Sequence, residues 1–124
     1  MDQKPKVLVV DDEPFNVDYL EQELEGSNYE IVSASNGREA LDKIHSQRPD
    51  LVLLDLMMPV LDGFAVLAQL KADPDLREIP VIIISAANDS RSIVKGIKQG
   101  AEDYLTKPID ENLLIKKLKE YLGS

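Results

Sequence analysis

Short apolar runs alternate along the chain with longer stretches in which apolar residues recur every three or four positions. The first pattern is typical of buried strands, and the second is typical of helices that have one apolar face. The expected strands span residues 6–10, 30–34, 51–54, 80–84 and 103–106. The expected helices run from Pro14 to Leu24, between Asn36 and Arg48, over 63–72, around 93–97, and from Asp110 to Tyr121.

The order of these elements predicts the fold class. The first, third and fourth strands are apolar nearly throughout, as expected of parallel strands that are covered on both faces. Since strand–helix–strand connections are right-handed, helices should lie on both sides of the sheet. We expect an α/β fold: a five-stranded, doubly wound parallel sheet with five flanking helices. With 124 residues and no long linker or repeat, the chain (1–124) is expected to form one domain.

Composition and charge narrow the chemistry. The chain has no cysteine, which excludes disulfides and thiol nucleophiles, and its single histidine, His45, excludes multi-histidine metal sites. The net charge of −9 repels phosphates, so no direct contact with nucleic acid or a membrane surface is expected. Neither a membrane span nor a signal peptide is visible, so we expect a cytoplasmic protein.

Polar residues gather directly after the expected strands. They are Asp11, Asp12 and Glu13 after the first strand, Asp55 after the third, Ser85 after the fourth and Lys107 after the fifth. Any one acid in such a place can simply cap the next helix. Ligand sites of open α/β sheets, however, lie at the carboxyl ends of the strands, and clustered carboxylates repel one another unless a cation intervenes. Oxygen ligands without histidine or cysteine favour Mg²⁺, with Mn²⁺ as the alternative.

Five segments, taken in order, give the chain a resemblance to a known family. They are VLVVDDE (7–13), PDLVLLDLMMP (49–59), DG (62–63), IIISA (82–86) and GAEDYLTKP (100–108). The chain resembles the receiver domain of two-component response regulators, in particular the chemotaxis-regulator-like receivers, over close to its whole length. This resemblance implies a flavodoxin-like fold with strand order 2-1-3-4-5, and a phosphoacceptor signalling domain rather than a turnover enzyme.

The resemblance also implies a role for each site residue. Asp55 would be phosphorylated by the phosphohistidine of a sensor histidine kinase or a phosphotransfer protein. Asp12, Asp55 and the backbone carbonyl of Met57 would bind Mg²⁺, and Asp11 would assist through water.

Three further residues would respond to the phosphoryl group. Ser85 and Lys107 would hold the phosphoryl oxygens and assist the reaction, and Tyr104 would move together with Ser85. The Lys107–Pro108 peptide bond would be cis. The surface formed by the fourth helix, fifth strand and fifth helix would then change and control a downstream protein or an output domain outside this chain.

Two positions that tune the lifetime of the phosphoryl group in this family are occupied here by Met57 and Ala87. Neither side chain can hold an attacking water by hydrogen bonding, so slow self-dephosphorylation is expected.

Other functions remain open from the residues alone. The same fold can serve as a phosphorylation-independent interaction module, which a missing acceptor, acid or lysine would favour. A phosphatase with an aspartyl nucleophile would need an acid where Met57 stands. A flavin-binding module would need a first loop that cradles a phosphate, which the acids at 11–13 would repel. The oligomeric state, the partner kinase and the pathway stay open.

Overall fold

Five parallel strands form a single sheet in the computed structural model, which describes residues 4–24, 26, 28–56, 58, 61–86 and 88–123. The strands are β1 (Lys6–Val10), β2 (Glu30–Ala34), β3 (Leu51–Asp55), β4 (Val81–Ala86) and β5 (Asp103–Lys107), in the order β2-β1-β3-β4-β5. The helices are α1 (Pro14–Leu24), α2 (Gly37–Gln47), α3 (Gly63–Ala72), α4 (Ser90–Lys98) and α5 (Glu111–Leu122). The predicted fold class and strand order are confirmed.

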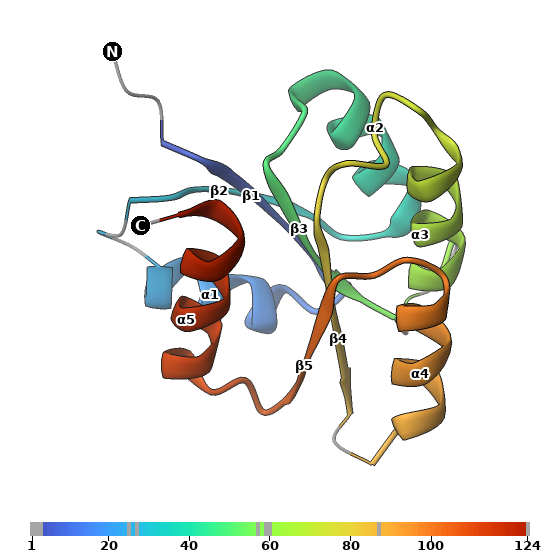
Figure 1. Ribbon diagram of the computed structural model, residues 1–124. Coiled ribbons are helices and arrows are strands. Elements are labelled where there is room, and N and C mark those ends of the chain that lie inside the picture. The colour runs from blue at the N-terminus through green and yellow to red at the C-terminus, as the bar shows by residue number, and fades with distance from the viewer. Residues whose placement is uncertain are drawn as a thin grey trace.

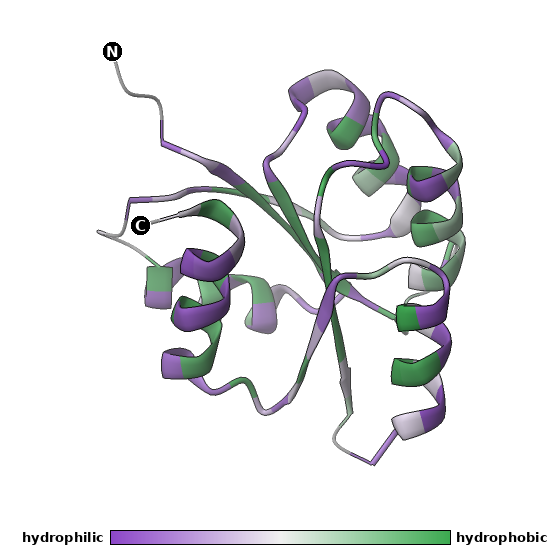
Figure 2. Cartoon of the chain, viewed as in Figure 1, coloured by the Kyte–Doolittle hydropathy of each residue, from purple (hydrophilic) through white to green (hydrophobic). Residues whose placement is uncertain are grey.

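The sheet separates two layers of helices, with α1 and α5 on one face and α2, α3 and α4 on the other (Figure 1). Because successive strand residues point to opposite faces, β1 supplies both layers. Val7 and Val9 pack in the cluster that includes α1 and α5, whereas Leu8 and Val10 pack in the cluster that includes α2 and α3. Figure 2 shows the consequence as hydrophobic strands at the centre and helices with hydrophilic outer sides. Within the described residues, no helix is long and apolar enough to cross a membrane.

The fourth and fifth strands continue further than their apolar patterns predicted. Ser85 pairs with Thr106 and Ala86 with Lys107, so the ladder extends into polar sequence. Backbone pairing does not require apolar side chains, and this is why the hydropathy pattern ended too early. At the other end, the Pro80 carbonyl accepts a hydrogen bond from the Val52 amide (3.0 Å), but proline has no N–H to donate and the strand begins at Val81.

Several acids outside the strands act as helix caps. The side chains of Asp62, Asp89 and Asp110 accept hydrogen bonds from backbone N–H groups in the first turns of α3, α4 and α5, respectively. A cap satisfies donors that the helix itself cannot pair. The acids at the ends of β1 and β3 are arranged differently.

Candidate functional site

Three carboxylates meet at the carboxyl end of the sheet. Asp11 and Asp12 follow β1, Asp55 ends the neighbouring β3, and one oxygen of each lies within 4.8 Å of the others. Asp11 and Asp55 are only 2% and 4% exposed, and Asp12 is the more open member of the cluster. Like charges at this separation repel one another, and burial strengthens the repulsion. The exposed Glu13 is not part of this cluster.

Lys107 brings positive charge to the cluster from the end of β5. Its Nζ lies 3.0 Å from Asp55 Oδ2 and 3.7 Å from Asp11 Oδ2. Partial burial alone lowers the pKa of Lys107, but the hydrogen bond and charge of Asp55, with the charges of Asp11 and Glu13, raise the pKa above its ordinary value. The ammonium is therefore firmly charged at neutral pH. The peptide bond that follows it, Lys107–Pro108, is cis, as predicted.

Two residues that closely follow Asp11 in the sequence donate hydrogen bonds to its carboxylate. Its Oδ1 accepts a hydrogen bond from the Glu13 backbone N–H (3.0 Å), and its Oδ2 accepts one from the Asn16 side-chain amide (3.2 Å). Sequence reasoning missed Asn16. The signal that could have found it is its place in the first turn of the helix that directly follows the acids.

Ser85 lies in β4, beside β3 and β5, and is 3% exposed. Its Oγ is buried and has no hydrogen-bond partner in the described part of the chain. A buried hydroxyl without a partner costs free energy, and such groups in folded proteins call for an explanation. A bound oxyanion would supply the acceptor that this hydroxyl lacks.

Gly63, the first residue of α3, allows the helix to abut the end of β3. A Cβ atom at this position would lie 2.5 Å from the Asp55 carbonyl oxygen and 2.7 Å from Leu56 Cα. The Gly63 N–H also donates to the Leu56 carbonyl (3.1 Å). Any larger residue would push the helix away, so this glycine helps to fix the backbone beneath Asp55.

The remaining predicted residues stand apart from the cluster or outside the described residues. Tyr104 is 44% exposed on β5, with its ring centroid 6.0 Å from Lys117 Nζ. Its movement with Ser85 stays a prediction. Met57 and Ala87 lie outside the described residues, so the carbonyl ligand and the lifetime of the phosphoryl group stay predictions. His45 is exposed near the end of α2.

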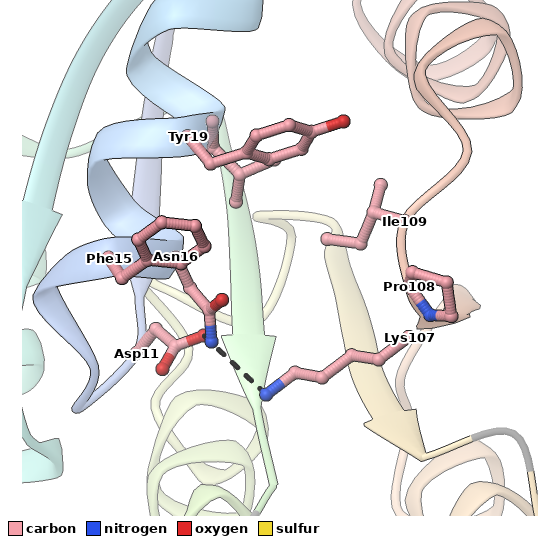
Figure 3. A pocket seen from close by; sticks show the side chains of 8 residues that line it. Asp11, Phe15, Asn16, Tyr19, Lys107, Pro108 and Ile109 are labelled. Carbon is pink, nitrogen blue, oxygen red and sulfur yellow. Dashed lines mark hydrogen bonds and ion pairs between the residues drawn. The ribbon is translucent and has the colours of Figure 1, made fainter.

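A hollow of about 540 Å³ opens beside the cluster, between α1 and the segment that follows β5. Figure 3 shows Phe15 and Tyr19 on the α1 side and Pro108 and Ile109 opposite them, with Lys107 reaching toward Asp11. Asp11 is the member of the acidic cluster that lines this hollow, together with Lys107.

The fold and the acidic cluster define a class of protein, and the family comparison agrees with it. The family model described as "Response regulator receiver domain" matches residues 7–119. The chain therefore belongs to the response regulator receiver family, whose members are phosphoacceptor signalling modules of two-component systems rather than turnover enzymes. The phosphatase and flavin-binding alternatives are thereby set aside.

Individual relatives differ in length. The chain is 38% identical to Protein PilH of Pseudomonas aeruginosa, over 95% of this chain and 98% of PilH. It is 43% identical to Response regulator PleD of Caulobacter vibrioides, over 92% of this chain but only 25% of PleD. The chain thus corresponds to nearly all of one relative and to a quarter of another.

A solved structure supports the interpretation of the acidic cluster. The receiver domain of a sensor histidine kinase from Pseudomonas aeruginosa matches with a TM-score of 0.87 and 29% identity, over 97% of this chain and 98% of that chain. That receiver was crystallised with a magnesium ion coordinated in its active-site cleft. In the present chain, the cluster of Asp11, Asp12 and Asp55 offers oxygen ligands suited to a hard cation.

Proposed function

We propose that Asp55 accepts a phosphoryl group from the phosphohistidine of a sensor histidine kinase or a phosphotransfer protein, in a Mg²⁺-dependent reaction. The observation that carries this proposal is the meeting of three carboxylates at the ends of β1 and β3, with the Lys107 ammonium among them. Asp12 and Asp55 would hold the ion directly, with the Met57 carbonyl, and Asp11 would act through water. Mn²⁺ is the expected substitute because it shares the preference for oxygen ligands.

The transfer itself forms one bond and breaks one. A carboxylate oxygen of Asp55 attacks phosphorus, the new O–P bond forms, and the N–P bond to the donor imidazole breaks as the electron pair returns to that nitrogen. When bound, Mg²⁺ neutralises charge on the phosphoryl oxygens, which is much of what phosphoryl transfer requires. Lys107, already 3.0 Å from Asp55, would exchange that contact for the phosphoryl oxygens. The Ser85 hydroxyl, which has no partner among the described residues, would donate to another of these oxygens.

The phosphoryl group would then act as the signal. It raises the charge at Asp55 from one to about two and creates new charge-assisted hydrogen bonds. Such bonds are worth about 1.5–3 kcal/mol each, and moving a two-state equilibrium from 1:99 to 99:1 takes about 5.5 kcal/mol. Two bonds, from Ser85 and Lys107, would therefore supply much of a shift at the surface formed by α4, β5 and α5. The target of that surface would be a downstream protein or an output domain.

The test is chemical phosphorylation followed by intact mass. Wild-type protein incubated with acetyl phosphate and Mg²⁺ should gain one phosphoryl group, and EDTA should abolish the gain. Asp55→Asn should not react, whereas Asp50→Asn, at the opposite end of β3, should react like wild type. Labelling of Asp55→Asn would show that another residue is the acceptor. Failure of wild type with both acetyl phosphate and a phosphorylated histidine kinase domain would favour the phosphorylation-independent module.

A further inference from the structure

Asn16 lies in the first turn of α1 and is half-buried. Helical side chains tilt toward the helix N-terminus, so a first-turn residue can reach back over the end of the preceding strand. Asn16 does so, and its Nδ2 donates a hydrogen bond to Asp11 Oδ2 at 3.2 Å (Figure 3). The acceptor is a carboxylate, so only the nitrogen of the amide can face it.

The Asp11 carboxylate depends on this contact because it is almost fully buried. Its Oδ1 is held by the Glu13 backbone N–H, while its Oδ2 faces both Asn16 and Lys107. Lys107 lies nearer to Asp55 (3.0 Å) than to Asp11 (3.7 Å), and in the proposed function it turns to the phosphoryl oxygens. The hydrogen bond from Asn16 involves neither Lys107 nor Asp55, so it can hold Asp11 before and after phosphorylation.

We propose that Asn16 is a positioning residue of the cation site, which orients Asp11 toward Asp12 and Asp55. This inference rests on the proposed function, because it assigns Asn16 to the Mg²⁺ site proposed there. A neutral amide suits the task, since it fixes the carboxylate without adding positive charge that would compete with the cation. A leucine of similar size would fill the same space but leave Oδ2 without its donor.

The experiment compares Mg²⁺ binding by isothermal titration calorimetry in wild type, Asn16→Leu and Asn16→Ala. Loss of a group that holds a metal ligand usually weakens metal affinity 10–100-fold. Because Asp11 would act through water and Asn16 is only half-buried, we expect the lower end of this range, about tenfold weaker binding in both variants. Asn16→Gln keeps the amide donor and should recover part of the loss. Asn112→Leu is the matched control, because Asn112 is exposed in the first turn of α5.

Two further readouts separate positioning from a merely structural role. Thermal unfolding of the metal-free variants should show that they are folded. A fall in Mg²⁺ affinity is then not caused by loss of the folded state. With acetyl phosphate, the loss should appear as a higher Mg²⁺ requirement, and the rate at saturating Mg²⁺ should approach that of wild type.

The outcomes distinguish this inference from the proposed function. Equal Mg²⁺ affinity in wild type and both Asn16 variants would overturn the inference alone, as would an equal loss in Asn112→Leu. A wild type that binds no Mg²⁺ would overturn the proposed function, and this inference with it.

Discussion

Three carboxylates at one end of the sheet and three at the other are held in opposite ways. At the amino ends of the strands, Asp50, Glu102 and Asp103 each have partners of their own. Asp50 accepts a hydrogen bond from the Lys6 backbone N–H (2.7 Å). Glu102 pairs with Lys71 (3.1 Å) and accepts from the Val81 N–H (2.8 Å). The third acid, Asp103, pairs with Lys117 (2.8 Å) and with the Tyr121 hydroxyl (3.1 Å).

At the carboxyl ends, two buried acids, Asp11 and Asp55, share the ammonium of Lys107, and Asp12 lies beside them. The Ser85 hydroxyl lacks a partner within the described residues. The number of acids is therefore not what distinguishes a functional end from a structural one. The difference is that Asp11 and Asp55 share one ammonium at the carboxyl end, whereas Glu102 and Asp103 at the amino end each have an ammonium of their own. In the proposed function, a cation and a phosphoryl group would complete the carboxyl end.

The largest expected effect is a loss of Mg²⁺ affinity when an acid at the carboxyl end of the sheet is removed. Removal of an acid at the amino end is the comparison. Asp12→Asn removes a proposed direct ligand, so Mg²⁺ affinity should fall by about a hundredfold or more, because loss of a group that only holds a ligand already costs about 10–100-fold. Asp103→Asn, at the amino end, should leave Mg²⁺ affinity unchanged although it removes the partner of Lys117. Calorimetric titration of both variants checks this. Similar losses in the two variants would mean that the effect is general electrostatics and not a site.

The reverse experiment removes contacts at the amino end of the sheet and measures the free energy of unfolding. The Lys71 ammonium contacts Glu102 and the carbonyls of Arg77 and Ile79, and its side chain is 16% exposed. Lys71→Met leaves these acceptors without their donor, so the free energy of unfolding should fall by about 1–3 kcal/mol. Urea unfolding measures this loss, and Mg²⁺ affinity should not change. Lys98→Met makes the same change at an exposed position of α4 and should be nearly neutral. Equal stability of the two variants would contradict the account of the amino end.

A smaller effect should appear at alkaline pH through Tyr121. Burial, together with the charge and hydrogen bond of Asp103, raises the pKa of Tyr121 to about 12. The unfolded chain releases this proton near pH 10, so the contribution to stability is fully present below about pH 10 and is lost as pH rises through about 12. Urea unfolding in this range should give a shallower decline for Tyr121→Phe than for wild type. Tyr19→Phe is the control, and an unchanged decline in Tyr121→Phe would contradict the prediction.

The sequence predicted the fold and the position of the site because both follow from local pattern. Buried parallel strands leave apolar runs, and the residues at the carboxyl ends of β1, β3 and β5 lie at one edge of the sheet. The pairs at the amino end could not be predicted in this way. Lys71 and Glu102 are 31 positions apart, and their contact depends on how the end of α3 packs near the residue that precedes β5. Asn16 could not be predicted as a site residue, because an asparagine in the first turn of a helix indicates no role until its partner is known.

The most direct test of the central claim is to locate the phosphoryl group itself. Protein phosphorylated with acetyl phosphate and Mg²⁺ is reduced with borohydride, which converts an aspartyl phosphate to homoserine with loss of phosphate, and is then mapped by peptide mass spectrometry. The account predicts homoserine at position 55 alone, and none in a sample treated with EDTA. Homoserine at position 11 or 12, or at an acid of the amino end such as position 50, would contradict it.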